Sequence, residues 1–228
     1  MSKDKTTKPD ENLKEVESAL TSAERFFEEN SKIITIIFGA AIVIALLLLV
    51  THRFYSMPRE AKALDQISGA QNYFEKDSFN LAINGDGNYP GFLDIIDEYG
   101  GTKPGKLARY YTGISYLHLG KYNEAIEYLE DFKTDDPLLG PVKVGATGDA
   151  YAELGKKEKA IDLYLEAAEL NKNVFTTPIY FLKAGKMYET LGNKEKALEM
   201  YEKIKDEYPK STEAQTIDKY IARITAVN

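Results

Sequence analysis

LHLGKYNEAI at residues 117–126 recurs with few changes as AELGKKEKAI at residues 152–161 and as ETLGNKEKAL at residues 189–198. The glycines of the three copies stand 35 and 37 residues apart, at Gly120, Gly155 and Gly192. A repeat of this length is typical of arrays in which each unit is a hairpin of two helices. The period therefore predicts an all-α solenoid of stacked helical hairpins.

The same small and large residues recur at fixed places around each turn. A glycine precedes a tyrosine by three positions, and an alanine and then a bulky residue follow the turn. We expect the glycine to let the second helix approach and the tyrosine to fill the space beside it. The positions are Gly113, Gly148 and Gly185; Tyr116, Tyr151 and Tyr188; Ala125, Ala160 and Ala197; and Leu129, Tyr164 and Tyr201.

This pattern resembles the tetratricopeptide repeat, with three repeats over residues 105–211. Two of the repeats close with a helix-ending proline, Pro137 or Pro209, whereas Lys172 stands at the corresponding place in the middle repeat. The resemblance implies an array of helical hairpins that binds other proteins.

The segment EYPKS at residues 207–211, which ends one helix and begins the next, resembles EYGGT at residues 98–102, before the first clear repeat. We therefore expect a degenerate repeat over residues 57–104, with its second helix interrupted by NGDGNYPG at residues 84–91. Residues 212–228 carry apolar side chains at helical spacing, which predicts a C-terminal capping helix over the last repeat.

An apolar run of eighteen residues extends from Ile33 to Val50, with Lys32 at one edge and His52 and Arg53 at the other. As a helix it is roughly 27 Å long, about the thickness of the hydrocarbon core of a bilayer. It exceeds the apolar core of a typical signal peptide, and no small-residue cleavage site follows it. We therefore predict a transmembrane helix over residues 32–53 that keeps the chain anchored.

Residues 1–31 form a polar head that ends in a stretch with amphipathic spacing, marked by Leu13, Val16, Leu20, Ala23 and Phe27. The spacing predicts a helix that lies against the membrane or a neighbouring subunit, and self-pairing into a homo-oligomer is the alternative.

Composition argues against several function classes. The chain has 228 residues, a net charge of −7, no cysteine and two histidines. Without a basic patch, nucleic-acid binding is not expected. With His52 and His118 far apart and no cysteine, no usual nucleophile-base pair or metal set can be assembled. We predict a protein that is not an enzyme and has no cofactor and no metal.

The repeat resemblance implies that the first helices of successive hairpins line a concave groove. Its predicted entrance is apolar and its far end charged, and Gly145 and Ala152 also project into it. Tyr110 and Ile114 stand where the lysine and asparagine of a carboxylate clamp would be, so recognition of chaperone tails is not expected. The alternative is that these are ordinary exposed residues of a solenoid. The predicted binding residues are Tyr110, Ile114, Leu117, His118, Asp149, Glu153, Leu182, Lys186 and Glu189.

The order of head, anchor and repeats, together with TSAERFFEENSKII at residues 21–34 and LAINGDGNYPGFLDIIDEYGGT at residues 81–102, resembles the YfgM-like ancillary subunits of the bacterial Sec translocon. This resemblance implies a single-pass protein of the bacterial inner membrane with a cytoplasmic N-terminus and periplasmic repeats. Its implied partners are the SecYEG translocon and a periplasmic chaperone. Charge alone does not fix the orientation, because basic residues flank both ends of the apolar run.

Two other roles use the same architecture. A scaffold for cell-envelope or cell-division machinery would employ the same groove and anchor. A chaperone that holds unfolded clients would overlap with the translocon role. An enzyme is the third class, and it is the least favoured because no catalytic constellation is visible.

Overall fold

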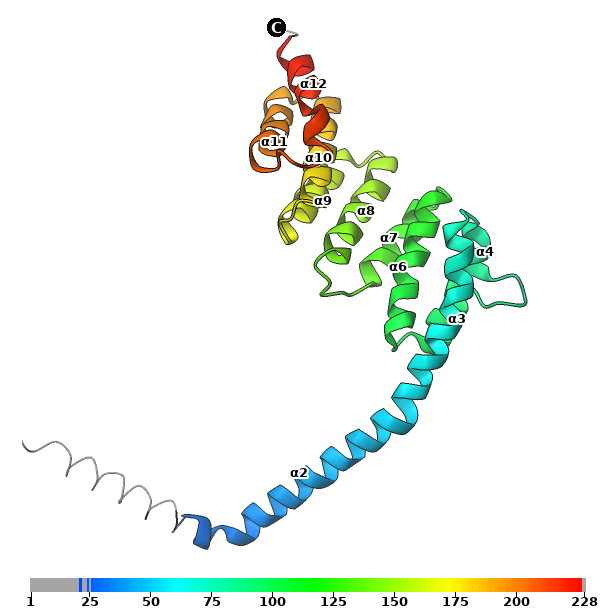
Figure 1. The fold of residues 1–228 in the computed structure, drawn as a ribbon, viewed down its shortest axis with the longest axis vertical. Coiled ribbons are helices and arrows are strands. Elements are labelled where there is room, and N and C mark those ends of the chain that lie inside the picture. The colour runs from blue at the N-terminus through cyan, green and yellow to red at the C-terminus, as the bar shows by residue number, and fades with distance from the viewer. Residues whose placement is uncertain (1–20, 22–23, 25, 227–228) are drawn as a thin grey trace, which may run out of the picture. The chain divides into compact units, whose positions relative to one another are not determined.

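The computed structural model describes residues 21, 24 and 26–226 (Figure 1). The amphipathic stretch expected over residues 13–27 lies almost wholly outside the described residues. The chain divides into two compact units, Met1–Pro58 and Arg59–Asn228, which are described in turn.

The first unit contains α2 (Ser31–Thr51), which continues into a five-residue π-helix, η1 (His52–Ser56). None of its residues is buried within the part of the chain that the structure describes. The hydroxyls of Thr35 and Thr51 donate to carbonyls one turn earlier, those of Ser31 at 2.7 Å and Leu47 at 2.9 Å. The hydroxyls of both threonines are therefore satisfied within the helix. This helix is the one among the described residues that is long and apolar enough to cross a membrane.

The second unit is a series of helices, which confirms the predicted all-α repeat fold, and no strand occurs in the described part of the chain. Helices α6 and α7, α8 and α9, and α10 and α11 form three hairpins that pack one on the next (Figure 1). The helices are α3 (Met57–Glu75), α4 (Phe79–Asn84), α5 (Phe92–Tyr99), α6 (Lys103–His118), α7 (Tyr122–Asp131), α8 (Leu139–Glu153), α9 (Lys157–Leu170), α10 (Thr177–Thr190), α11 (Lys194–Glu207) and α12 (Ala214–Thr225).

The first helix of each hairpin ends in the same turn. After α6, the Lys121 N–H donates to the Tyr116 carbonyl at 2.9 Å and the Gly120 N–H to the Leu117 carbonyl at 3.2 Å. This pair of bonds needs a residue with positive φ, and Gly120 has φ 72°. The same bonds follow α8 and α10, at Gly155 and Gly192.

The turn after α3 has the same bonds without a glycine. Asp77 takes the left-handed conformation with φ 55°, and the Ser78 N–H donates to the Tyr73 carbonyl at 2.9 Å. Asp is one of the residues that tolerate this conformation. The region before the first clear repeat therefore uses the repeat's own turn, with α4 ending at Asn84 and α5 starting at Phe92.

The space beside each first-helix glycine is filled from the second helix, so the expectation that the neighbouring tyrosine fills it is wrong. A Cβ added at Gly113 would lie 2.6 Å from Leu129, and one added at Gly185 would lie 2.4 Å from the Tyr201 ring. Gly148 meets Tyr164 in the same way. In each hairpin, the glycine of the first helix and the bulky residue at the equivalent place on the second helix are thus a packing pair.

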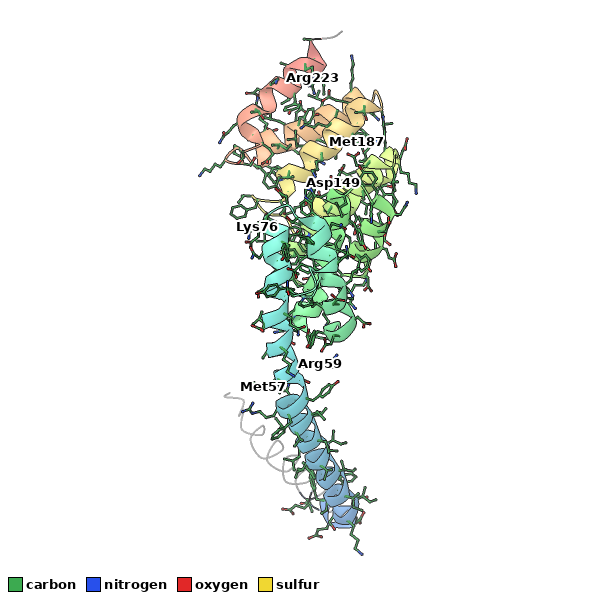
Figure 2. All side chains as sticks on the ribbon, turned by 90° about the vertical axis from the view of Figure 1, so that its right-hand side faces the viewer. Met57, Arg59, Lys76, Asp149, Met187 and Arg223 are labelled. Atoms are coloured by element: carbon green, nitrogen blue, oxygen red, sulfur yellow. The ribbon has the colours of Figure 1, made fainter. Side chains whose placement is uncertain are left out.

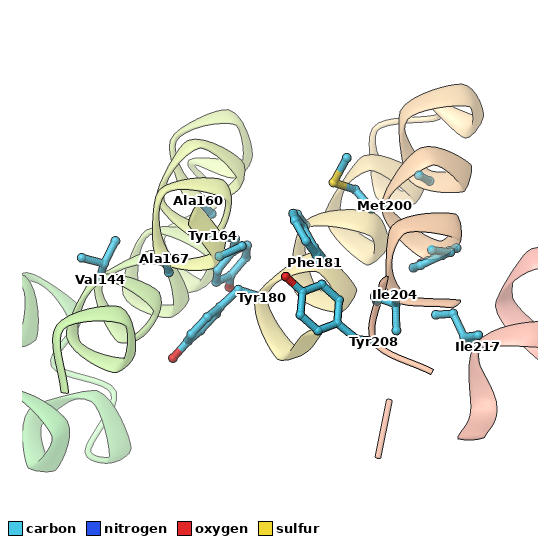
Figure 3. Close-up of a cluster of buried hydrophobic side chains, with 14 of the residues drawn as sticks. Val144, Ala160, Tyr164, Ala167, Tyr180, Phe181, Met200, Ile204, Tyr208 and Ile217 are labelled. Atoms are coloured by element: carbon cyan, nitrogen blue, oxygen red, sulfur yellow. The ribbon is translucent and has the colours of Figure 1, made fainter. Parts of the chain in front are cut away.

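The buried side chains of α8 to α12 form one continuous cluster (Figure 3). Phe181 and Tyr201 are at most 2 % exposed in it, and α12 contributes Ile217 and Ile224. Because α12 covers apolar residues of the last hairpin and turns polar residues outward, it ends the array as a capping helix. A second cluster joins α3, α4, α5 and α6 around Phe92.

We predict that Gly185→Ala destabilises the protein, although an alanine in a helix normally gains about 1 kcal/mol over glycine. The new methyl would overlap the buried Tyr201 ring, and overpacking of this kind costs about 1–3 kcal/mol. Thermal unfolding of the full chain in detergent, followed by circular dichroism, should show a midpoint lower by about 2–4 °C per kcal/mol.

Gly101→Ala is the matched control, because a Cβ at Gly101 meets no atom within 4 Å. An unfolding midpoint of Gly185→Ala at or above that of the wild type would mean that the two helices of the hairpin are not as close as described.

Candidate functional site

A pocket of about 290 Å³ lies between the ends of the first helices α6 and α8. It brings together three of the predicted binding residues, Leu117, Asp149 and Glu153. Ala152, which was also expected to project into the groove, lines the pocket with them. Leu117 and Ala152 contribute apolar lining, and Asp149 and Glu153 contribute two carboxylates. The lining residues are Leu117, Tyr122, Asp149, Ala152, Glu153 and Tyr164.

Asp149, labelled on α8 in Figure 2, is already held by two protein groups. Both of its oxygens accept from the Lys183 ammonium at 2.7 Å, and one accepts from the Tyr164 hydroxyl at 2.8 Å. Burial, followed by the charge of Asp149, raises the pKa of the Tyr164 phenol, so this hydroxyl stays protonated and donates. Because both partners of the ion pair are about one-third exposed, it contributes on the order of 0.5–1 kcal/mol.

Glu189 is held by the capping helix rather than left open. Its oxygens accept from the Arg223 guanidinium at 2.7 and 2.9 Å, and one also accepts from the Tyr201 hydroxyl. The ammonium of Lys186 lies 5.2 Å from the centre of the Tyr220 ring, a cation-π contact. The charged end of the predicted groove is therefore engaged with α12.

Glu153 remains the most accessible acidic group of the pocket. The residue is exposed, and within the described part of the chain its carboxylate accepts one hydrogen bond, from the Tyr122 hydroxyl at 3.3 Å. A ligand group that donates a hydrogen bond to Glu153 would displace a long and weak bond, which distinguishes this carboxylate from Asp149.

The other predicted binding residues are dispersed over the unit. Tyr110 is partly buried against Phe132, with ring centres 5.6 Å apart, and burial raises its pKa. His118 stacks on Phe79 of α4 at 4.4 Å between ring centres. Ile114 and Leu182 are of intermediate exposure, and Leu182 packs against the main buried cluster.

Gly145 is not an open position of the groove. It is buried, and a Cβ placed on it would lie 1.9 Å from the Tyr180 ring, which comes from α10. Figure 3 shows Tyr164 of α9 and Tyr180 of α10 where the α8–α9 hairpin meets the α10–α11 hairpin. The Tyr180 ring from the next repeat therefore closes the middle of the groove at Gly145.

Sequence reasoning missed Lys183, Tyr122 and Tyr164 as residues of this site. One signal was available, because Lys183 follows Asp149 by 34 residues and Arg223 follows Glu189 by the same interval. In each pair a basic residue follows an acidic one by about one repeat, from α8 to α10 and from α10 to the capping helix α12. A search of the sequence at the repeat period would find this pattern.

The carboxylate of Asp86, in the loop NGDGNYPG, is already hydrogen-bonded within the protein. Asp86 accepts from the Tyr73 hydroxyl at 2.7 Å and from the N–H groups of Tyr89 and Asn88 at 2.8 and 2.9 Å. These bonds, led by that of Tyr73, lower the pKa of Asp86 to about 2. The described residues contain no group of three His, Asp or Glu side chains that could hold a metal ion.

Comparison with known proteins agrees with the repeat geometry. Residues 107–138 and 180–211 match one model of the tetratricopeptide repeat, and residues 147–174 match a second model of this repeat. No curated protein matches the sequence.

Similar solved structures include the MamA protein, with 22% identity, a TM-score of 0.55, and coverage of 72% of this chain and 83% of that chain. They also include two structures of nearly identical TPR-like repeats named for a kinesin light chain of Podospora anserina, both with 14% identity and a TM-score of 0.56. Coverage there is 73% of this chain and 86% or 87% of the other. At these identities the likeness shows the fold alone. The second unit is thus a solenoid of tetratricopeptide repeats, the architecture of a protein-protein interaction module.

Proposed function

We propose that this protein is a membrane-anchored interaction module that binds a protein partner through the pocket between α6 and α8. The observation that carries the proposal is the composition of this pocket. Leu117 and Ala152 provide an apolar wall, and Glu153 provides an acceptor whose internal bond is weak. A partner segment with an apolar side chain next to a hydrogen-bond donor satisfies both features.

The exposed helix α2 supports the anchoring. Its eighteen-residue apolar window has a mean hydropathy of 3.2, and none of it is buried in the described structure. Such a surface is strongly unfavourable in water, at about 25 cal/mol for each Å² of apolar area. A bilayer covers a helix of this length on all sides without any further protein.

The place of action that we propose is the bacterial inner membrane, with the N-terminus in the cytoplasm and the repeats in the periplasm. The proposed role is that of an ancillary subunit of the SecYEG translocon or of an adaptor for a periplasmic chaperone. This assignment rests on the resemblance to YfgM-like proteins, and the repeat fold agrees with it because such repeats bind proteins.

Leu117→Ala should reduce recovery of the translocon with the detergent-solubilised full chain by roughly tenfold. The substitution removes a side chain that lines the pocket, and truncation of an interface anchor commonly costs 1–2 kcal/mol or more. Recovery is measured by quantitative immunoblotting of the translocon in the purified material. Leu117 is a cleaner target than Tyr110, which packs against Phe132.

Leu119→Ala is the matched control, because Leu119 is 39 % exposed, two residues away, and outside the pocket. Equal recovery with both variants would reject the pocket as the binding site. Recovery of cell-division or cell-wall proteins in place of the translocon would reject the proposed role while leaving the pocket as a binding site.

The proposed orientation predicts that protease added to intact spheroplasts digests the repeats and spares the N-terminal head. A tag at each end of the chain, read by immunoblotting, reports the two fates separately. Loss of the N-terminal tag with protection of the C-terminal tag would show the opposite orientation. Release of the chain by alkaline carbonate would contradict the anchor itself.

A further inference from the structure

The turn between α9 and α10 presents apolar side chains to solvent. Phe175 is 70 % exposed, more than any other large apolar residue of the second unit's described part, and Val174 is 57 % exposed. Leu170, at the end of α9, is 55 % exposed. Single exposed apolar residues are common, but three within six positions form a patch of the kind that marks a contact surface.

Hydrogen bonds fix this turn in its conformation. The Asn173 carboxamide oxygen accepts from the N–H groups of Phe175 and Thr176, both at 2.8 Å. Its amide nitrogen donates to the Asn171 carbonyl and to the Thr176 hydroxyl, both at 2.7 Å. A loop held in this way cannot turn Val174 and Phe175 inward, so their exposure is a property of the folded state.

A pocket of about 340 Å³ adjoins the patch, on the side of the preceding inter-repeat connection. The Asn171 amide donates to the Pro137 carbonyl at 2.8 Å, which joins the two connections. Leu138, next to Pro137, is 47 % exposed and extends the apolar area. We name the whole the loop-edge surface: the exposed residues Leu138, Leu170, Val174 and Phe175, and the pocket residues Thr134, Asp135, Asp136, Pro137, Gly140, Pro141 and Asn171.

The charge of this surface is negative. Asp136 accepts from the N–H groups of Leu139 and Leu138 at 2.8 Å, which lowers its pKa, so it stays ionised. Asp135 is exposed and forms no ion pair within the described part of the chain. Three lysines border it: Lys172 is paired with Glu169 at 2.8 Å, and Lys133 and Lys143 donate to the carbonyls of Glu130 and Phe132. The ionisable residues of the surface itself, Asp135 and Asp136, are both acidic. An anionic lipid surface would be repelled here, whereas a cationic side chain would be attracted.

We propose that the loop-edge surface is a second docking site, and that its occupant is an apolar segment of a partner protein carrying a lysine or arginine. Phe175 and Val174 supply the apolar contact, and the pocket with Asp135 receives the cation. This site shares no residue with the pocket between α6 and α8. It therefore allows the array to hold two segments at once, which goes beyond the single binding site of the proposed function.

A peptide selection tests whether the surface prefers apolar and cationic segments. A random library of twelve-residue peptides is selected for binding to the full chain in nanodiscs of phosphatidylcholine. The peptides retained should be enriched in apolar residues flanking a lysine or arginine. The double variant Val174→Ser with Phe175→Ser should bind them at least about tenfold more weakly. Asp135→Asn should lower the affinity for these peptides roughly two- to fivefold, the range for an exposed ion pair.

Leu64→Ser serves as the matched control, since Leu64 is 64 % exposed on α3, outside the loop-edge surface. Leu117→Ala should also leave binding of these peptides unchanged, which separates this site from the pocket between α6 and α8. The proposal is overturned if no peptide distinguishes the wild type from the double variant, or if the retained peptides carry no excess of cationic residues.

Phe175→Trp tests the alternative of lipid contact, because the chain contains no other tryptophan. In nanodiscs the indole should show the emission of a water-exposed ring, and brominated lipids should not quench it. Addition of a retained peptide should shift the emission to shorter wavelength. Quenching by brominated lipid in the absence of peptide would assign the surface to the membrane and overturn the proposal.

Discussion

The architecture depends on the close approach of two helices at a glycine. In each hairpin a bulky side chain of the second helix occupies the space that a Cβ on the first helix would need, as Tyr201 does at Gly185. Because interiors are packed at crystal-like density, this contact fixes how deeply the helices interlock. The left-handed turn glycine then returns the chain in the only direction that completes the contact, and each hairpin offers its remaining apolar face to the next.

The same contact also determines the chemistry of the groove. Where the bulky residue is a tyrosine, its hydroxyl reaches a carboxylate on the first helix, so Tyr164 holds Asp149 and Tyr201 holds Glu189. In the α6–α7 hairpin the corresponding residue is Leu129, which has no hydroxyl. In two of the three hairpins, the tyrosine at this packing position thus also holds a carboxylate of the first helix. Lys183 and Arg223, each 34 residues further on, pair with these carboxylates and leave Glu153 as the more accessible acidic group of the pocket.

Sequence periodicity was sufficient to predict the helical hairpins, their turns and the capping helix, because turns and helix periods are local properties. It could not identify the partner of each glycine. Gly113 and Tyr116 lie on one helix, and which side chain fills the space depends on the crossing of a second helix. The turn at Asp77 and Ser78 could be expected without a glycine, since a glycine is favoured at the left-handed position but not required.

The predicted binding residues show the same limit. Leu117, Asp149 and Glu153 share a pocket, whereas Gly145 is covered by Tyr180 and Glu189 is bound by α12. These differences arise from contacts between repeats, whose geometry depends on the stacking of whole hairpins. The loop-edge surface was not predicted at all, because exposure of Val174 and Phe175 follows from the hydrogen bonds of Asn173 rather than from any periodic pattern.

The central claim is that the first helices of the array receive a protein partner at the pocket between α6 and α8. Site-specific photocrosslinking in intact membranes tests it most directly, with benzoylphenylalanine placed at Ala152 in the pocket or at Glu166, exposed on the second helix α9. The account predicts a discrete protein adduct from Ala152 and none of comparable yield from Glu166. Absence of an adduct from Ala152, or the same adduct at equal yield from both positions, would contradict it.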